Sequence, residues 1–124
     1  MKLSPILALA LLALPAYAAS KQDEAAGAIL FRDRGCTYCH GDHLQGTDRA
    51  PSLDKVRDKL KADKITAQIT HGSLQMPAFG EILTPPEIAQ LVGFLRSKHR
   101  PAIPPAPAGA TPAAPPPLPS TKPQ

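Results

Sequence analysis

The sequence is poor in large side chains and in cysteine. Its 124 residues include no tryptophan, three phenylalanines, two tyrosines and two cysteines. A domain shorter than about 100 residues with so few large apolar side chains buries little surface of its own. It usually needs a disulfide, a metal or a cofactor for stability. The composition therefore indicates that a non-protein group completes the core.

No long run of charge of one sign is present. The chain carries a formal net charge of +4, and the basic residues from Lys55 to Lys64 alternate with Asp54, Asp58 and Asp63. Such mixing is typical of a solvated helix surface, whereas nucleic-acid binding requires clustered basic residues. We expect no nucleic-acid partner; weak docking to an acidic protein is the alternative.

No apolar run is long enough to cross a bilayer. The longest lies in residues 1–18, which begin with Lys2 and end in the small-x-small pattern of Ala16 and Ala18. Its roughly 14 apolar residues fall short of the 20 or so that a membrane helix needs. The pattern is that of a secretory signal peptide. We expect cleavage after Ala18, a periplasmic location and no membrane span in the mature chain.

The C-terminal residues 100–124 lack aromatic side chains and are rich in proline. Ten of the 24 residues from Pro101 onward are prolines. Proline supplies no backbone donor and fixes φ, so this segment cannot form a helix or a central strand. We expect a disordered or polyproline II tail that is either a plain spacer or a tether to a partner. The folded domain is then confined to residues 19–99.

Convincing strand patterns are also absent, whereas four helical segments can be placed. Thr84, Pro85 and Glu87 form the clearest start signal, and the apolar residues from Ile88 to Leu95 follow at helical spacing. This helix should run to about Lys98. The other three segments are a helix from Ser20 to near Gly35, a short one over Leu53, Val56 and Leu60, and one capped by Asp63 and ended by Gly72. The predicted class is all-α, with loops at 41–52 and 73–83.

Both cysteines lie in one short motif, Cys36-Thr-Tyr-Cys39-His40, predicted at the end of the first helix. A disulfide suits an exported protein, but the redox fold with this spacing needs strands. Structural zinc requires four ligands, and no second cysteine pair exists. The third interpretation uses every residue, because C-x-x-C-H is the attachment signature of c-type haem. Both sulfurs share one helix face, and His40 can offer Nε2 to the iron.

A second axial ligand can be sought further along the chain. Met76 lies 36 residues after His40 and is followed by Pro77, which stiffens its turn. A thioether ligand favours ferrous iron and raises the potential. A buried methionine that merely fills space is the plain alternative. His71 is the rival ligand, whereas His43 is too close to His40 and His99 lies at a helix end.

The motifs "GAILF", "CTYCHG", "APSLD", "HGSLQMPAFG" and "PEIAQLVGFL" between residues 25 and 97 resemble the class I monohaem cytochromes c. The resemblance implies a small all-α fold of about four short helices around one covalent haem c. It implies that Cys36, Cys39, His40, Pro51 and Met76 bind the cofactor, with His40 and Met76 on the iron.

Further roles are implied by the same resemblance. The first and last helices should cross at Gly27 and Phe31, against Leu91 and Phe94. The Pro51 carbonyl should accept a hydrogen bond from His40 Nδ1. Relatives often place a tryptophan near a haem propionate; here Arg49, Arg57, Lys59 or another donor must replace it.

The implied function is that of an exported one-electron carrier, not an enzyme, which works as a monomer with a dehydrogenase, cytochrome complex or oxidase as partner. We expect the surface around Tyr38, Gly41 and Met76–Phe79 to contact partners. The alternative is a cytochrome c subunit of a membrane-associated oxidase or dehydrogenase, tethered by the proline-rich tail. A haem enzyme or gas sensor would need an open sixth iron position, which a Met76 ligand would close.

Overall fold

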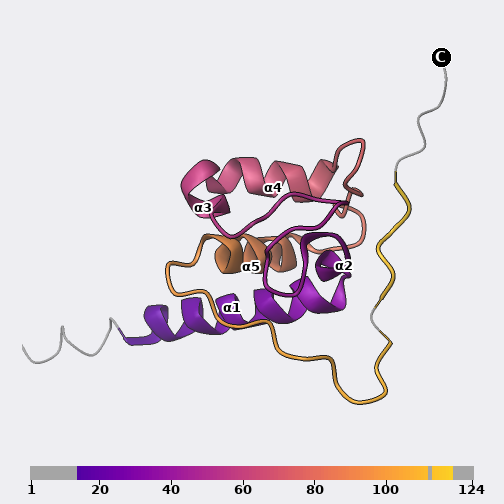
Figure 1. The fold of residues 1–124 in the computed structure, drawn as a ribbon. Coiled ribbons are helices and arrows are strands. Elements are labelled where there is room, and N and C mark those ends of the chain that lie inside the picture. The colour runs from indigo at the N-terminus through magenta and orange to yellow at the C-terminus, as the bar shows by residue number, and fades with distance from the viewer. Residues whose placement is uncertain (1–13, 112, 119–124) are drawn as a thin grey trace, which may run out of the picture.

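The computed structural model describes residues 14–111 and 113–118, and within these it is helical, without strands. Residues 1–13, most of the predicted signal peptide, lie outside this range, and residues 14–18 belong to the first helix. The helices, labelled in Figure 1, are α1 (Leu14–Asp33), α2 (Cys36–His40), α3 (Val56–Lys59), α4 (Ala62–His71) and α5 (Pro85–Arg96).

The all-α class is confirmed, but the helix count and several boundaries differ from the prediction. Helix α1 begins at Leu14, six residues before the predicted start at Ser20. The residues around the predicted start are rich in alanine, a strong helix former, and they continue the helix in the N-terminal direction. The C-x-x-C-H motif, Cys36–His40, forms the separate helix α2, because Gly35 adopts φ 77° and interrupts the helical conformation between α1 and α2.

The other helices lie close to their predicted positions. Helix α4 starts at Ala62 with Lys61 as its N-cap, so Asp63 lies in the first turn and does not cap it. Thr84 is the N-cap of α5, and it forms the expected capping box with Glu87. Helix α5 ends at Arg96, two residues before the predicted end.

Helices α1 and α5 pack directly on one another and form the base of the fold (Figure 1). The approach is close because Gly27 has no side chain: a Cβ there would meet the Gln90 carbonyl oxygen and lie 2.7 Å from Phe94 Cβ. The centroids of the Phe31 and Phe94 rings are 5.7 Å apart and the rings are tilted by 53°, within the distance range of favourable aromatic pairs. The crossing implied by the family resemblance is therefore present.

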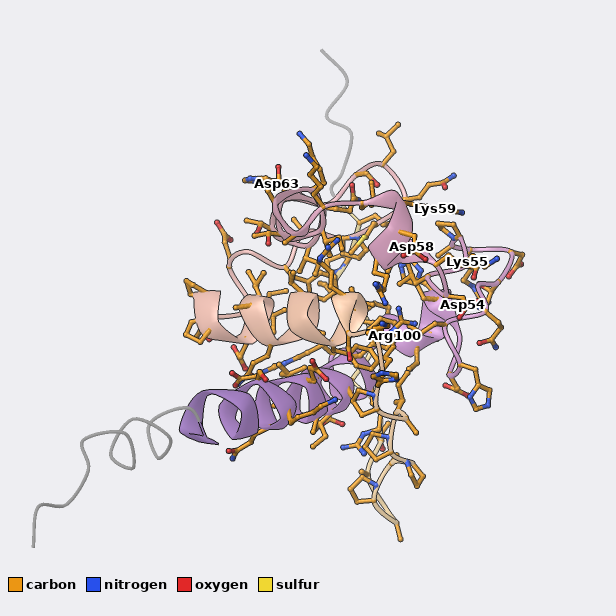
Figure 2. All side chains as sticks on the ribbon, turned by 90° about the vertical axis from the view of Figure 1, so that its left-hand side faces the viewer. Asp54, Lys55, Asp58, Lys59, Asp63 and Arg100 are labelled. Carbon is orange, nitrogen blue, oxygen red and sulfur yellow. The ribbon has the colours of Figure 1, made fainter. Side chains whose placement is uncertain are left out.

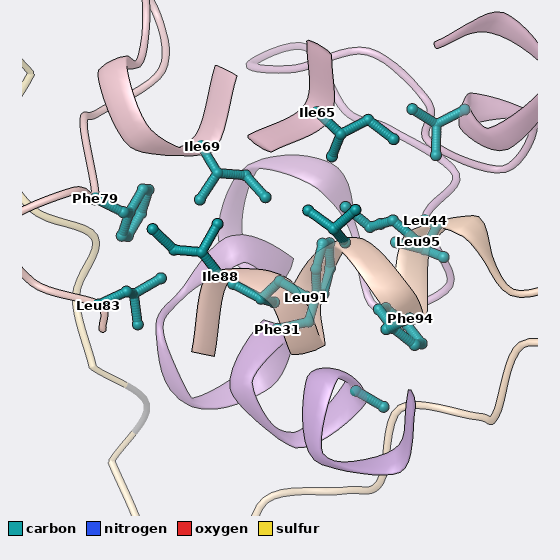
Figure 3. Packing of buried hydrophobic residues seen from close by; sticks show 13 residues of the cluster. Phe31, Leu44, Ile65, Ile69, Phe79, Leu83, Ile88, Leu91, Phe94 and Leu95 are labelled. Carbon is teal, nitrogen blue, oxygen red and sulfur yellow. The ribbon is translucent and has the colours of Figure 1, made fainter. Parts of the chain in front are cut away.

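Apolar side chains from α1, α4, α5 and the loops converge above this crossing (Figure 3). Phe31, Leu91 and Phe94 are at most 2% exposed. Phe79 and Leu83 anchor the loop between α4 and α5 in the same cluster. The loop is thereby fixed on the core, although it contains no regular structure.

The charged segment around α3 lies on the outside of the molecule. In Figure 2 the side chains of Asp54, Lys55, Asp58 and Lys59 point away from the domain, with both signs interspersed. All four are exposed. This agrees with the predicted solvated surface.

Candidate haem site

A cavity of about 380 Å³ lies between α1, α2, α4, α5 and the two long loops. Cys36, Cys39, His40, Pro51 and Met76 all line it, so the fold brings together every predicted site residue. Most of its remaining wall is apolar; these residues are Phe31, Leu53, Val56, Leu60, Ile65, Ile69, Pro77, Phe79, Leu91 and Leu95. A cavity with apolar walls and a few polar groups suits a large, mainly apolar planar ligand.

Helix α2 presents three of these residues on little more than one turn. Cys36 and Cys39 do not form a disulfide with each other, and both are partly buried. Burial raises the pKa of the Cys36 thiol to about 12, because the charged thiolate would be poorly solvated. Before haem is attached, this thiol therefore ionises less readily than an exposed cysteine.

His40 is buried, and its position is fixed by the loop that follows α2. Its Nδ1 lies 2.9 Å from the carbonyl oxygen of Pro51. An N–H on Nδ1 donates to that carbonyl, which leaves the lone pair on Nε2 free for a metal. The hydrogen bond implied by the resemblance is therefore present.

The loop between α2 and α3 is itself held by several hydrogen bonds. The Gly46 N–H donates to the His40 carbonyl at 2.8 Å. The carbonyl of Leu44 accepts from the Leu53 N–H at 2.8 Å and from Ser52 Oγ at 3.0 Å. Leu44 has φ 62°, a left-handed conformation that costs a leucine about 1–2 kcal/mol. Burial of its side chain offsets this strain, and the pinned loop delivers the Pro51 carbonyl to His40.

Met76 comes from the loop after α4, which turns back over the end of that helix. Gly72 makes the turn with φ 65°, and the Ser73 N–H donates to the Met76 carbonyl at 2.8 Å. The Phe79 N–H donates to the Ile69 carbonyl at 2.9 Å. The Met76 side chain is half-buried and packs against the core.

Gln68 is a site residue that the sequence analysis missed. It lines the cavity, and its Nε2 donates to Met76 Sδ at 3.5 Å. A glutamine on the polar face of α4 carries no motif of its own. Its position eight residues before Met76 gains meaning only when the loop folds back.

Of the other candidate iron ligands and propionate donors, only one lines the cavity. His43, His71 and His99 are exposed and do not line it. Arg49 lines the cavity, with its guanidinium 4.6 Å from the centre of the Tyr38 ring, a cation–π distance. Arg57 and Lys59, the other propionate partners considered, are not among its lining residues.

The residues that mark the predicted partner surface differ in their exposure. Tyr38 is 57% exposed, as expected, but Gly41, Pro77 and Phe79 are buried. Gly41 lies beneath the Gln45 side chain, and Pro77 and Phe79 turn inward to anchor their loop. Their side chains therefore add little to that surface, where Ala78 is exposed and Met76 is half-buried.

Comparison with known proteins identifies the family. The family model described as "Cytochrome C oxidase, cbb3-type, subunit III" matches residues 22–95, more than half of the chain. The chain belongs to this family of c-type cytochromes. It binds haem c covalently, and it is an electron-transfer protein, not an enzyme.

Two relatives place this cytochrome among known proteins. It is 34% identical over 77 residues to "Cytochrome c6" of Aphanizomenon flos-aquae. This alignment covers 59% of the chain and 87% of that protein. It is 44% identical over 54 residues to the "Menaquinol:cytochrome c reductase cytochrome c subunit" of Bacillus subtilis (strain 168), which covers 44% of the chain. The match spans only 20% of that subunit. Within residues 14–111 and 113–118, no helix is long and apolar enough to cross a membrane.

Proposed function

We propose that Cys36 and Cys39 form the two thioethers to haem and that His40 Nε2 and Met76 Sδ are the axial iron ligands. The observation that carries this proposal is the shared cavity, which all four residues line with Pro51. The chemistry of these side chains fits haem c. Two cysteine thiols, an imidazole whose Nδ1 is hydrogen-bonded to Pro51, and a thioether are the groups that bind such a haem.

When bound, haem iron supplies the reversible exchange of one electron. The residues of the chain set the conditions for that exchange. Pro51 keeps the His40 imidazole in one tautomer and orientation, which also strengthens Nε2 as a donor. Met76 provides a soft sulfur that favours the reduced state. The apolar wall excludes water, and Phe31, Leu91 and Leu95 form part of that wall.

We propose further that the chain is exported by residues 1–18 to the periplasm and there carries electrons between redox proteins as a monomer. The N-terminal sequence pattern supports export. A dehydrogenase, cytochrome complex or oxidase would serve as partner. The exposed Tyr38 and Leu74, 57% and 76% accessible, are available for small redox interfaces.

The second candidate is a subunit of a membrane-associated oxidase or dehydrogenase complex, with the proline-rich tail as tether. The B. subtilis relative, itself a reductase subunit, favours it. Gentle purification from membranes and periplasm separates the two. A free carrier elutes alone as a monomer from the periplasmic fraction, whereas a subunit co-purifies with its complex.

The ligand roles are tested by the ferric absorption spectrum of a Met76→Ala variant. We expect the wild type to be low-spin, with the weak far-red band of sulfur-ligated haem, and the variant to lose that band. Leu74→Ala is the matched control, because it truncates an exposed side chain of the same loop. A high-spin wild type, or a band retained in Met76→Ala, contradicts the proposal.

A further inference from the structure

We propose that the proline-rich tail is a strap that folds back along α1 and covers the opening of the haem cavity beside Cys36. The strap comprises residues 101–111 and 113–118. This inference rests on the proposed haem site, because the strap limits access to a group held there. It concerns the tail, to which the family match over residues 22–95 does not extend.

The first part of the strap is fastened to α1 and to the core. Arg32 Nη1 donates to the carbonyl oxygens of Pro104 at 3.2 Å and Pro105 at 2.8 Å. Hydrogen bonds from a charged donor are among the stronger ones in proteins. The Arg32 side chain is only 14% exposed, and Ile103 packs against the core cluster. These contacts fix the point from which the strap continues.

A turn then directs the chain toward the cavity. The Ala110 N–H donates to the Pro107 carbonyl at 3.0 Å, and Gly109 has φ 84°, which glycine adopts without strain. Figure 1 shows this segment, orange to yellow, following α1 and then turning upward beyond the end of that helix near α2. This turn brings the chain back to the domain, where Ala113 and Pro115 lie next to Gly35. 

The second contact lies at the cavity itself. The Ala113 carbonyl approaches Gly35 so closely that a Cβ on that glycine would lie 2.7 Å from its oxygen. Pro115 is half-buried and lines the cavity together with Gly35 and Cys36. Pro117, two residues later, is exposed. Proline-rich chain is already extended before it docks, so little entropy is lost when it does.

The closed strap has a direct consequence for electron exchange. Redox partners approach a haem where it is least covered, and Pro115 is part of the cavity wall to which Gly35 and Cys36 also belong. A redox partner that uses the opening beside Cys36 must first displace the strap. The observed rate then depends on the fraction of molecules in which the strap is open. A partner that binds the prolines would hold the strap open and raise the rate.

The position of the strap is tested by NMR of the full-length ferrous holoprotein. We expect cross-relaxation between the Pro115 δ-protons and the Gly35 α-protons, because a Cβ on Gly35 would lie 3.4 Å from Pro115 Cδ. It should be lost in Arg32→Gln, which removes the anchor, and kept in Arg34→Gln. Arg34→Gln is the matched control, because it removes the same positive charge near the same end of α1. Arg34 pairs with Glu87, whereas Arg32 donates to the strap.

The function of the strap is tested by the bimolecular rate constant for oxidation by ferricyanide. We expect Pro115→Gly and Arg32→Gln to raise it about three- to tenfold, because only a few contacts hold the strap closed. Pro117→Gly is the control, because it introduces the same backbone freedom at an exposed position. It should leave the rate constant within about twofold of the wild type, since no contact of the strap is lost.

The outcomes separate the strap from the site. A low-spin, sulfur-ligated spectrum with no Pro115–Gly35 cross-relaxation, or with equal rates in the Pro115 and Pro117 variants, overturns the strap alone. A high-spin spectrum overturns the proposed ligand set. In that case the cross-relaxation and the oxidation rate constants of the same variants still decide whether the strap is present.

Discussion

His40 Nδ1 lies 2.9 Å from the carbonyl oxygen of Pro51, eleven residues further along the chain. The acceptor is a backbone atom, so no side-chain substitution at Pro51 removes it directly. Its position depends on the loop, and above all on the Leu44 carbonyl, which accepts from Ser52 Oγ and from the Leu53 N–H. The orientation of the proposed iron ligand therefore depends on hydrogen bonds that do not touch it.

This dependence predicts the behaviour of Ser52→Ala. The variant loses the bond to Leu44 and a second one from the Asp54 N–H at 3.3 Å. We expect the free energy of unfolding to fall by about 1–2 kcal/mol, as for one or two net hydrogen bonds. Denaturant unfolding measures the loss. Ser52→Thr keeps the hydroxyl and should recover most of it; equal losses in both variants would show that the hydroxyl is unimportant.

The crossing of α1 and α5 makes opposite predictions for two helical glycines. Gly27→Ala places a Cβ against the Gln90 carbonyl and Phe94. We expect a loss of about 1–3 kcal/mol, the usual cost of overpacking. Gly93→Ala is the matched control, because a Cβ there meets nothing within 4 Å. It should stabilise the protein by about 0.5–1 kcal/mol through helix propensity. Denaturant unfolding of both variants checks the pair, and a harmless Gly27→Ala would contradict the packing.

The capping box of α5 predicts a pH dependence. Hydrogen bonds from the Thr84 N–H and hydroxyl, followed by the Arg34 guanidinium, hold the pKa of Glu87 below its ordinary value. A depressed carboxylate pKa contributes stability that is fully present above the unfolded-state pKa. That contribution is lost as pH falls through the folded-state pKa. We therefore expect Glu87→Gln to be less stable than the wild type at neutral pH, with the gap closing under acid conditions.

Unfolding midpoints measured from neutral to acid pH test this expectation. Gln can still accept the Thr84 hydrogen bonds, so the variant isolates the charge of Glu87. Glu81→Gln makes the same substitution at an exposed position in the preceding loop. A gap for Glu87→Gln that stays constant with pH, or one that Glu81→Gln reproduces, would rule out the titration of Glu87 as its cause.

Local patterns in the sequence predicted the features that depend on neighbouring residues. The Thr84–Glu87 capping box and the spacing from Cys36 to His40 are of this kind, because each is complete within a few residues. The all-α class followed from the apolar periodicity. That Cys36, Cys39, His40, Pro51 and Met76 share one site was expected through the family resemblance.

Features that depend on distant contacts could not be predicted in the same way. The end of the first helix near Gly35 was predicted, but the separate helix over Cys36–His40 was not. The burial of Gly41 depends on the Gln45 side chain folding over it. The Arg32 anchor joins residues more than 70 positions apart. In each case the deciding interaction forms only after the chain has folded.

The hydrogen bond from Gln68 Nε2 to Met76 Sδ predicts how firmly the methionine is held. A thioether is a weak acceptor, and the bond directs one side of the sulfur toward α4. In Gln68→Leu this constraint is lost, so imidazole should displace the sulfur from ferric haem more readily. We expect the affinity for imidazole to rise about two- to tenfold, as for one net hydrogen bond. Spectroscopic titration measures it. Gln75→Leu, which changes another cavity-lining glutamine, should leave it unchanged; equal affinities in the two variants would mean that Gln68 does not hold Met76.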